Sequence, residues 1–386
     1  MLRWRALVAG VLLAVGASLA TAASASAFWG AALGPVVQGK VAFTQYSSEA
    51  ESTWLEVANL DGSERHDVAS AHGAWLMGVG PWSPDGRRLV FRRENDGGPR
   101  RRFWYVVNAD GSGLHPLARR LLPAAYISST VWSPSGAKIA FAYHRPTQTG
   151  RLKPSDVALY VVNAGGTRLR ELSRALPSRL PRLWRPDVFV DVLGWSASGR
   201  VVFYAWNVFS GHAGDPGNWE YTDIYAARVN GDGRRRIGRM HWDFLPEACS
   251  VAPNGMLLAC VDFDASLLDL MNLETGSRRR LLRQGLGGVA AVKWLPNNRE
   301  VVFEGWDYVD DEPRLGIIDI RTGDVRELAA GPFFRPFTVG RESGLIGYGS
   351  TTFHVITPEG TEVASFPLPG PTRPGAEAGV EVFYLQ

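Results

Sequence analysis

The chain has 386 residues, enough for several small domains or for one array of repeats. Hydrophobic residues make up 45% and charged residues 20%, a globular mixture that excludes a fully disordered chain. Its 43 Gly and 24 Pro are too many for a helix-rich protein, and its 14 Trp are typical of an all-β fold with many tight turns. The formal net charge of +3 is too small to indicate nucleic acid binding, and we predict none.

The first 27 residues are typical of a secretory signal peptide. Arg3 and Arg5 precede an apolar stretch over residues 6–20, which is short for a membrane span, and Ala25-Ser26-Ala27 fits a cleavage site. We therefore predict an exported protein, periplasmic or extracellular, that starts at Phe28 and has no membrane span after cleavage. An uncleaved membrane anchor is the alternative.

Internal repetition is the strongest signal downstream of residue 27. WSPDGRRLVF runs over residues 82–91, WSPSGAKIAF over 132–141 and WSASGRVVF over 195–203, and weaker copies begin at Gly39, Val251, Trp294 and Val339. Each copy is followed by an apolar run, a tight turn and a polar run, such as WYVVNADGSGLHPL from Trp104. The two series alternate seven times, which chance similarity would not produce.

The turn residues and apolar runs of each repeat predict a small antiparallel sheet. In WSPDG, Pro presets φ for a turn, Asp bonds nearby amides and Gly takes the left-handed position. The following runs LVF, IAF and VVF are continuously apolar, as in strands buried on both faces. The Arg-rich last strand forms a solvated edge that discourages sheet-to-sheet aggregation. Stacking such sheets radially buries both faces of each.

We therefore predict an all-β fold, a β-propeller of seven four-stranded blades over residues 28–366. A six-bladed ring and a β-sandwich are the alternatives. Residues 367–386 begin with a Pro-rich linker and end in a segment, Val380–Leu385, of strand character. That strand could complete a blade and close the ring, or dock outside it, and residues 28–38 could close the ring instead.

The WSPDG turn, its IAF-type strand and the YVVNADG turn resemble the WD40-like repeat (PD40) of the TolB-type propeller family. The same repeat occurs in the propeller domain of prolyl-oligopeptidase-like enzymes, so the resemblance implies an architecture more than a function. It covers about residues 36–366. This sequence departs from the pattern at Val251 and Val339, which replace Trp, at Ala197, which replaces Pro, and at Asn298, which replaces Gly.

Candidate binding residues lie on the face opposite the WSPDG turns, which carries the long insertions 142–156, 173–191 and 207–222. Aromatic rings beside carboxylates suit sugars, cations or peptide side chains. The candidates are Trp206, His212, Trp219, Glu220, His241, Trp242, Asp243, Trp306 and Asp307. Packing of the Trp residues between blades, with solvated acids, is the alternative.

His72, His144, His212 and His241 are also predicted on loops of that face, but no two have metal-ligand spacing. We predict no metal and no cofactor. Cys249 and Cys260 flank a Pro253-Asn254-Gly255 turn, and a hairpin there would bring them close enough for one disulfide. Two buried thiols are the alternative.

No G-x-S-x-G nucleophile motif, phosphate-binding loop or dinucleotide fingerprint occurs in the sequence. We therefore predict no catalytic residues and a non-catalytic exported scaffold, monomeric, that binds a protein, peptide or cell-envelope component. The alternative is a propeller enzyme, a hydrolase or lyase acting on sugars or peptides near the central axis of the loop-rich face.

Overall fold

In the computed structural model, residues 37–386 form one compact unit. The described residues are 39–47, 50–72, 76–95, 101–118, 121, 126–145, 156–172, 187–210, 219–240, 248–262, 267–281, 288–306, 313–330, 337–349, 352–368, 376–377 and 384–385. The predicted signal peptide lies outside them. Within the described residues, no helix has the length and apolar character that a membrane crossing needs.

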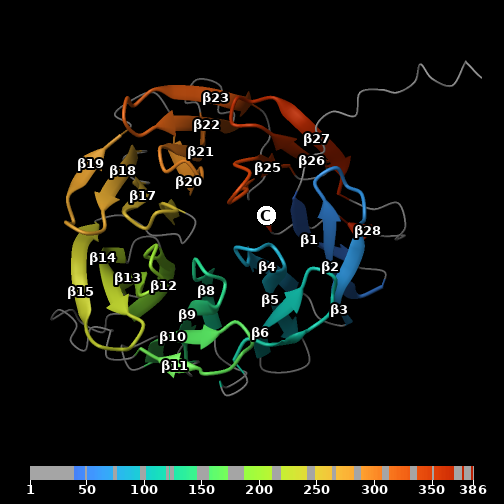
Figure 1. The fold of residues 1–386 in the computed structure, drawn as a ribbon, viewed down its shortest axis with the longest axis horizontal. Helices are drawn as coiled ribbons and strands as arrows, with labels where there is room; N and C mark the ends of the chain where they lie inside the picture. Colours follow the sequence, from blue (N-terminus) through green and yellow to red (C-terminus); the bar gives the residue numbers. More distant parts are fainter. Residues whose placement is uncertain are drawn as a thin grey trace, which may run out of the picture. The chain divides into compact units, whose positions relative to one another are not determined.

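The described strands form seven antiparallel sheets, arranged as the blades of a β-propeller (Figure 1). Blades 2–4 consist of β4 (Leu76–Trp82), β5 (Arg88–Asn95), β6 (Arg101–Asn108), β7 (His115–Pro116); β8 (Tyr126–Trp132), β9 (Lys138–His144), β10 (Val157–Asn163), β11 (Arg170–Glu171); and β12 (Asp187–Trp195), β13 (Val201–Phe209), β14 (Trp219–Arg228), β15 (Arg234–Met240). Blades 5–7 consist of β16 (Cys249–Val251), β17 (Leu257–Asp262), β18 (Leu267–Asn272), β19 (Arg278–Arg280); β20 (Gly288–Trp294), β21 (Glu300–Trp306), β22 (Pro313–Asp319), β23 (Val325–Ala330); and β24 (Thr338–Val339), β25 (Ile346–Tyr348), β26 (Thr352–Ile356), β27 (Glu362–Pro367). The seven-bladed prediction is confirmed.

Blade 1 contains strands from both ends of the described chain. It consists of β1 (Lys40–Ser47), β2 (Ser52–Asn59) and β3 (His66–His72), with β28 (Ala376–Glu377) and β29 (Tyr384–Leu385) paired to β1. Val41 pairs with Leu385 and Ser47 with Ala376, both antiparallel. The C-terminal strands therefore take the innermost place of this blade, which β4 or β8 takes in the next two blades. This pairing closes the ring.

Apolar side chains fill the layers between neighbouring blades, and each of the seven junctions has its own cluster in the described residues. Strand β13 contributes side chains to the apolar layers on both sides of its blade. Tyr204 and Trp206 pack toward blade 3, whereas Phe203 and Ala205 pack toward blade 5. Because successive side chains point to opposite faces, a strand buried on both sides must be apolar throughout.

The WSPDG-type turns set the register of the repeats. In blade 2, Ser83 N donates to Arg88 O at 2.7 Å, and in blade 4, Ser196 N donates to Val201 O at 2.9 Å. Val201 is therefore the counterpart of Arg88, and Tyr204, three residues later, is the counterpart of Phe91. The sequence comparison, which ended the third repeat at Phe203, was wrong by one residue.

The stacked aromatic pairs support this register. The rings of Phe91 and Tyr105 lie 5.5 Å apart, those of Phe141 and Tyr160 also 5.5 Å, and those of Tyr204 and Tyr225 5.3 Å. Each pair joins the second and third strands of its blade. We call the side of the ring that carries the turns between first and second strands, and between third and fourth strands, the turn face.

An inner belt of hydrogen bonds links blades near the axis. The indole Nε1 of three repeat Trp residues donates to a backbone carbonyl of the preceding blade: Trp132 to Pro81 at 2.9 Å, Trp195 to Val131 at 3.0 Å and Trp294 to Ser250 at 2.7 Å. These indoles also fill space between the blades, since all three are buried. The Trp of WSPDG is therefore a blade-joining residue.

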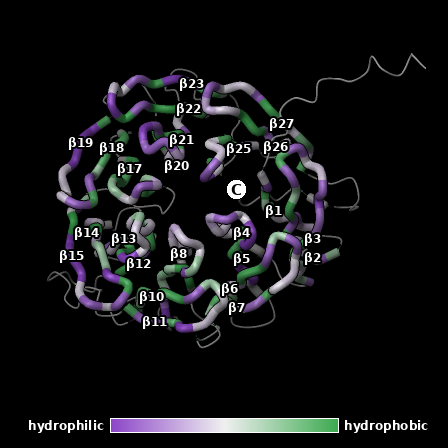
Figure 2. Tube along the Cα trace, in the orientation of Figure 1, coloured by the Kyte–Doolittle hydropathy of each residue, from purple (hydrophilic) through white to green (hydrophobic). Residues whose placement is uncertain are grey.

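An outer belt repeats the same principle at the edge. In blades 1 to 6, a basic residue near the start of the last strand bonds a carbonyl in the turn of the next blade: His66 to Ala109, His115 to Ala164, Arg170 to Asn230, Arg235 to Glu274, Arg279 to Ile320 and Arg326 to Pro358. Figure 2 shows β15 and β19 as largely hydrophilic at the edge of the ring. The Arg runs of these strands, predicted as merely solvated, thus also bind the next blade.

The disulfide Cys249–Cys260 lies within blade 5, where the two residues are directly paired between β16 and β17. The hairpin turn between them ends at Gly255, which has φ +69°. An added Cβ at Gly255 would lie 2.8 Å from Ala197 N in blade 4. Glycine is therefore required there both for the turn and for the close approach of the two blades.

Candidate functional site

The sequence-based site residues were predicted on the loop-rich face, and most of them lie outside the described residues. His212, His241, Trp242, Asp243 and Asp307 lie outside the described residues. Trp219 and Trp306 belong to β14 and β21, but their side chains are not described. The predicted grouping of aromatics and acids on that face therefore stays a prediction.

Two of the candidates have described side chains, and they differ in surroundings. Trp206 is 2% exposed and packs between blades 3 and 4, so its indole is part of the core. Glu220, on β14, is exposed to solvent. The nearby Asp223 is buried and bonds Arg239 at 2.8 and 2.9 Å, which makes it a structural ion pair of blade 4.

The described histidines do not form one cluster. His72 ends β3 in blade 1, where its Nδ1 lies 3.0 Å from Ser52 Oγ. His144 lies in β9 of blade 3, buried beside Phe189, whereas the sequence predicted it on a loop. Burial lowers the pKa of His144 to about 4. The imidazole of His144 is therefore neutral near pH 7. No group of three or more His, Cys, Asp or Glu in the described residues could hold a metal ion.

The turn face carries a depression on the propeller axis. Innermost strands of blades 3 to 7 all contribute to its wall, which places it where those blades converge. Its volume is about 220 Å³, and the indoles Trp132, Trp195 and Trp294 lie at its edge. Pro134, Pro253 and Pro296, from the turns of blades 3, 5 and 6, form a stiff rim. The inner belt of Trp hydrogen bonds thus also fixes the wall of this site.

Two cations dominate the electrostatics of the axial depression. Lys293 and Arg341 are its charged residues among the described lining, and both are positive. Lys293 precedes Trp294 at the end of β20, and Arg341 lies in the turn after β24. Desolvation lowers the pKa of Arg341 below its usual range, opposed by the charge of Glu342. Two cations, with no anion among the described lining residues, create a site that favours an anion.

A position-by-position comparison of the repeats would have found these residues. Arg341 occupies the turn position that is Pro84 in blade 2 and Pro134 in blade 3. Lys293 precedes the repeat Trp, where blade 3 has Val131. The sequence analysis treated these repeats only as weaker copies of the pattern. Two of their differences from it, Lys293 and Arg341, put positively charged side chains in the axial depression.

No protein-family model and no curated protein sequence matches this chain. Solved structures resemble it. A puromycin hydrolase mutant complexed with PGG is 19% identical with a TM-score of 0.56, over 86% of this chain and 52% of that chain. Oligogalacturonate lyase in complex with manganese is 12% identical with a TM-score of 0.56, over 85% of this chain and 86% of that chain. TolB from Acinetobacter baumannii is 14% identical with a TM-score of 0.45, over 75% of this chain.

These similarities concern the fold. The chain spans 63% of the TolB chain and about half of the hydrolase chain, and every identity is below one in five. The oligogalacturonate lyase and the puromycin hydrolase carry names of different activities, so a shared propeller fold does not by itself assign a function.

Proposed function

We propose that the protein is an exported binding scaffold whose turn face anchors an acidic segment of a protein or cell-envelope partner in the axial depression. The observation that carries this proposal is the pair Lys293 and Arg341, the charged residues of the described lining and both cationic. Export is supported by the signal-like residues 1–27 and by the disulfide Cys249–Cys260, since disulfides persist in oxidising compartments.

The dimensions of the depression suit one acidic group of an extended chain. About 220 Å³ admits a side chain or a chain terminus, not a folded element. Carboxylates bind guanidinium and ammonium groups by charge-assisted hydrogen bonds, and the indole and proline edges add apolar contact to the neighbouring atoms. Because two belts of hydrogen bonds join the blades, the site is preorganised and binding requires little reordering.

Fluorescence anisotropy with a labelled pentaglutamate peptide tests the proposal, with pentaglutamine as the neutral peptide. The test variant combines Lys293→Gln with Arg341→Gln. The matched control combines Arg87→Gln with Arg200→Gln, two exposed turn-face cations with the same change of charge. We expect the axial variant to bind pentaglutamate at least about tenfold more weakly than the wild type, and the control to bind as the wild type does. An equal loss in both variants would show attraction by general charge alone and would refute the axial site.

A further inference from the structure

Blades 2 and 3 are bridged on the turn face by two large side chains. Arg88 Nη2 donates to Gly136 O at 3.1 Å, across the junction, and the guanidinium carbon lies 5.1 Å from the ring of Trp132. Arg88 begins β5, and Trp132 ends β8 of the next blade. Together they cover the gap between the turns of the two blades.

The junction of blades 4 and 5 lacks both side chains. Val201 is the counterpart of Arg88, and Val251 replaces the repeat Trp. Val201 lines the space at this junction, whereas Val251 lines the axial depression and lies against Gly194 of blade 4. A cavity of about 630 Å³ opens at this junction on the turn face. Small-molecule sites commonly measure roughly 300–1,000 Å³, so the space suits a compact ligand.

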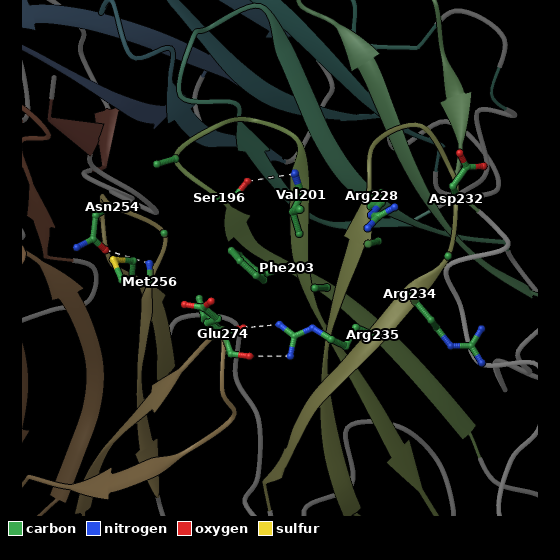
Figure 3. Close-up of a pocket in the computed structure, with 16 residues that line it drawn as sticks. Ser196, Val201, Phe203, Arg228, Asp232, Arg234, Arg235, Asn254, Met256 and Glu274 are labelled. Carbon is green, nitrogen blue, oxygen red and sulfur yellow. Dashed lines mark hydrogen bonds between the residues drawn. The ribbon is translucent and has the colours of Figure 1, made fainter.

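The cavity has an apolar floor. Val201, Phe203 and Ala226 of blade 4 face Leu273 and Met256 of blade 5. Phe203 and Leu273 are buried, whereas Met256 is 52% exposed at the opening. Figure 3 shows Phe203 between the Asn254–Met256 turn and β14–β15. An exposed Met beside an aromatic floor favours contact with apolar groups of varied shape.

Opposite charges flank this floor. Arg228 lies on the blade-4 side and Glu274 on the blade-5 side, and both are exposed (Figure 3). No hydrogen bond or ion pair joins either side-chain charge to another described residue. Arg235 is held differently, since its guanidinium donates to Leu273 O at 2.8 Å and Glu274 O at 2.9 Å and fixes the outer wall. The lining also contains Asp232, which accepts a hydrogen bond from Asn230, and Arg234, whose guanidinium lies 5.9 Å from the ring of Tyr225. Arg228 and Glu274 therefore offer a cation and an anion on opposite sides of the apolar surface.

We propose that this cavity binds a small zwitterion with apolar side chains, of the size and chemistry of a hydrophobic dipeptide. The ligand carboxylate meets Arg228, its ammonium group meets Glu274, and its side chains cover Phe203 and Leu273. This site lies between two blades, apart from the axial depression, and does not depend on the axial proposal. Charge complementarity at both ends distinguishes it from a general apolar groove.

Isothermal titration calorimetry with Leu-Leu tests the proposal, and N-acetyl-Leu-Leu-amide is the probe without charges. Val201→Arg gives blade 4 the bridging Arg that blade 2 has at the same position, and this side chain fills the cavity. Arg228→Gln removes one charge at an exposed position. The matched control is Leu257→Arg, at the equivalent position of the next blade, which does not line the cavity. Circular dichroism melting checks that each variant is folded.

We expect Leu-Leu to bind the wild type and Leu257→Arg equally, and to bind Val201→Arg and Arg228→Gln at least about tenfold more weakly. The capped peptide is expected to lose affinity by a similar factor. Absence of Leu-Leu binding to the wild type, or unchanged binding to Arg228→Gln, overturns the proposal. Equal binding of the capped peptide shows an apolar site without charge recognition and overturns it as well. If Val201→Arg does not fold, the Arg228→Gln result decides.

Discussion

His144 should make the stability of the propeller depend on pH. The side chain is 1% exposed in β9, and its Nε2 lies 3.1 Å from the carbonyl oxygen and 3.3 Å from the backbone N of Val190 in the next blade. Burial lowers the pKa of His144 from 6.5 to about 4, opposed by the hydrogen bond to the Val190 carbonyl. The folded protein therefore keeps this imidazole neutral at a pH where the unfolded chain protonates it.

The sign and size follow from proton linkage. Above pH 6.5 the residue is mostly neutral in both states and contributes no slope. Between pH 6.5 and about 4 the unfolded state binds one more proton, so the free energy of unfolding falls as the pH falls. Each pKa unit corresponds to ~1.4 kcal/mol, so the total loss of unfolding free energy from this residue is about 3–4 kcal/mol.

Urea unfolding followed by Trp fluorescence measures this effect in the wild type and in His144→Asn, at about pH 7 and about pH 4.5. Carboxylates titrate in both proteins, so their contribution cancels in the comparison. We expect the wild type to lose about 2–3 kcal/mol more than the variant between the two pH values. Equal losses in the two proteins would refute the buried, neutral state of His144.

Two further predictions concern blade closure and the disulfide. Arg65 pairs with the buried Glu56, donates to Leu368 O at 2.6 Å and stacks on Phe43, so Arg65→Met should lower the free energy of unfolding by about 2–4 kcal/mol. The control Arg326→Met removes a more exposed inter-blade Arg and should cost less than about 1 kcal/mol; similar urea midpoints for both variants would contradict the role of burial. Replacing Cys249 and Cys260 by Ala should cost about 3 kcal/mol in urea unfolding, because their disulfide closes a loop of sequence separation 11. An unchanged midpoint would argue against that role.

The blade architecture could be predicted from the sequence because its causes are local. The WSPDG turn is defined by the conformations of Pro and Gly within a few residues. The apolar runs on both sides of each turn require two covered faces, and seven copies provide them in a ring. The same reasoning did not establish which end closes the ring, since pairing of β1 with Tyr384–Leu385 joins segments more than three hundred residues apart.

The sequence analysis misjudged the environment of side chains that contact a neighbouring blade. Trp206 was a binding candidate, yet it packs against blade 3. His144 was predicted on a loop, yet it lies in a strand whose far end contacts blade 4. A single-residue difference in register exchanged Phe203 and Tyr204 between the two faces of blade 4. Successive residues of a strand face opposite layers, so an error of one position reverses the assignment.

The sequence alone determined the repeat, its turns and the requirement that each sheet be covered on both faces, because bonded neighbours and period-two alternation decide these features. Only the tertiary structure placed Lys293 and Arg341 on one axial depression and set Val201 opposite the turn of Gly255. The two residues of each pair are some fifty positions apart in the sequence. They lie near each other because equivalent positions of neighbouring blades are side by side in the ring. Adjacency across a junction depends on the packing of whole sheets, which no local pattern encodes.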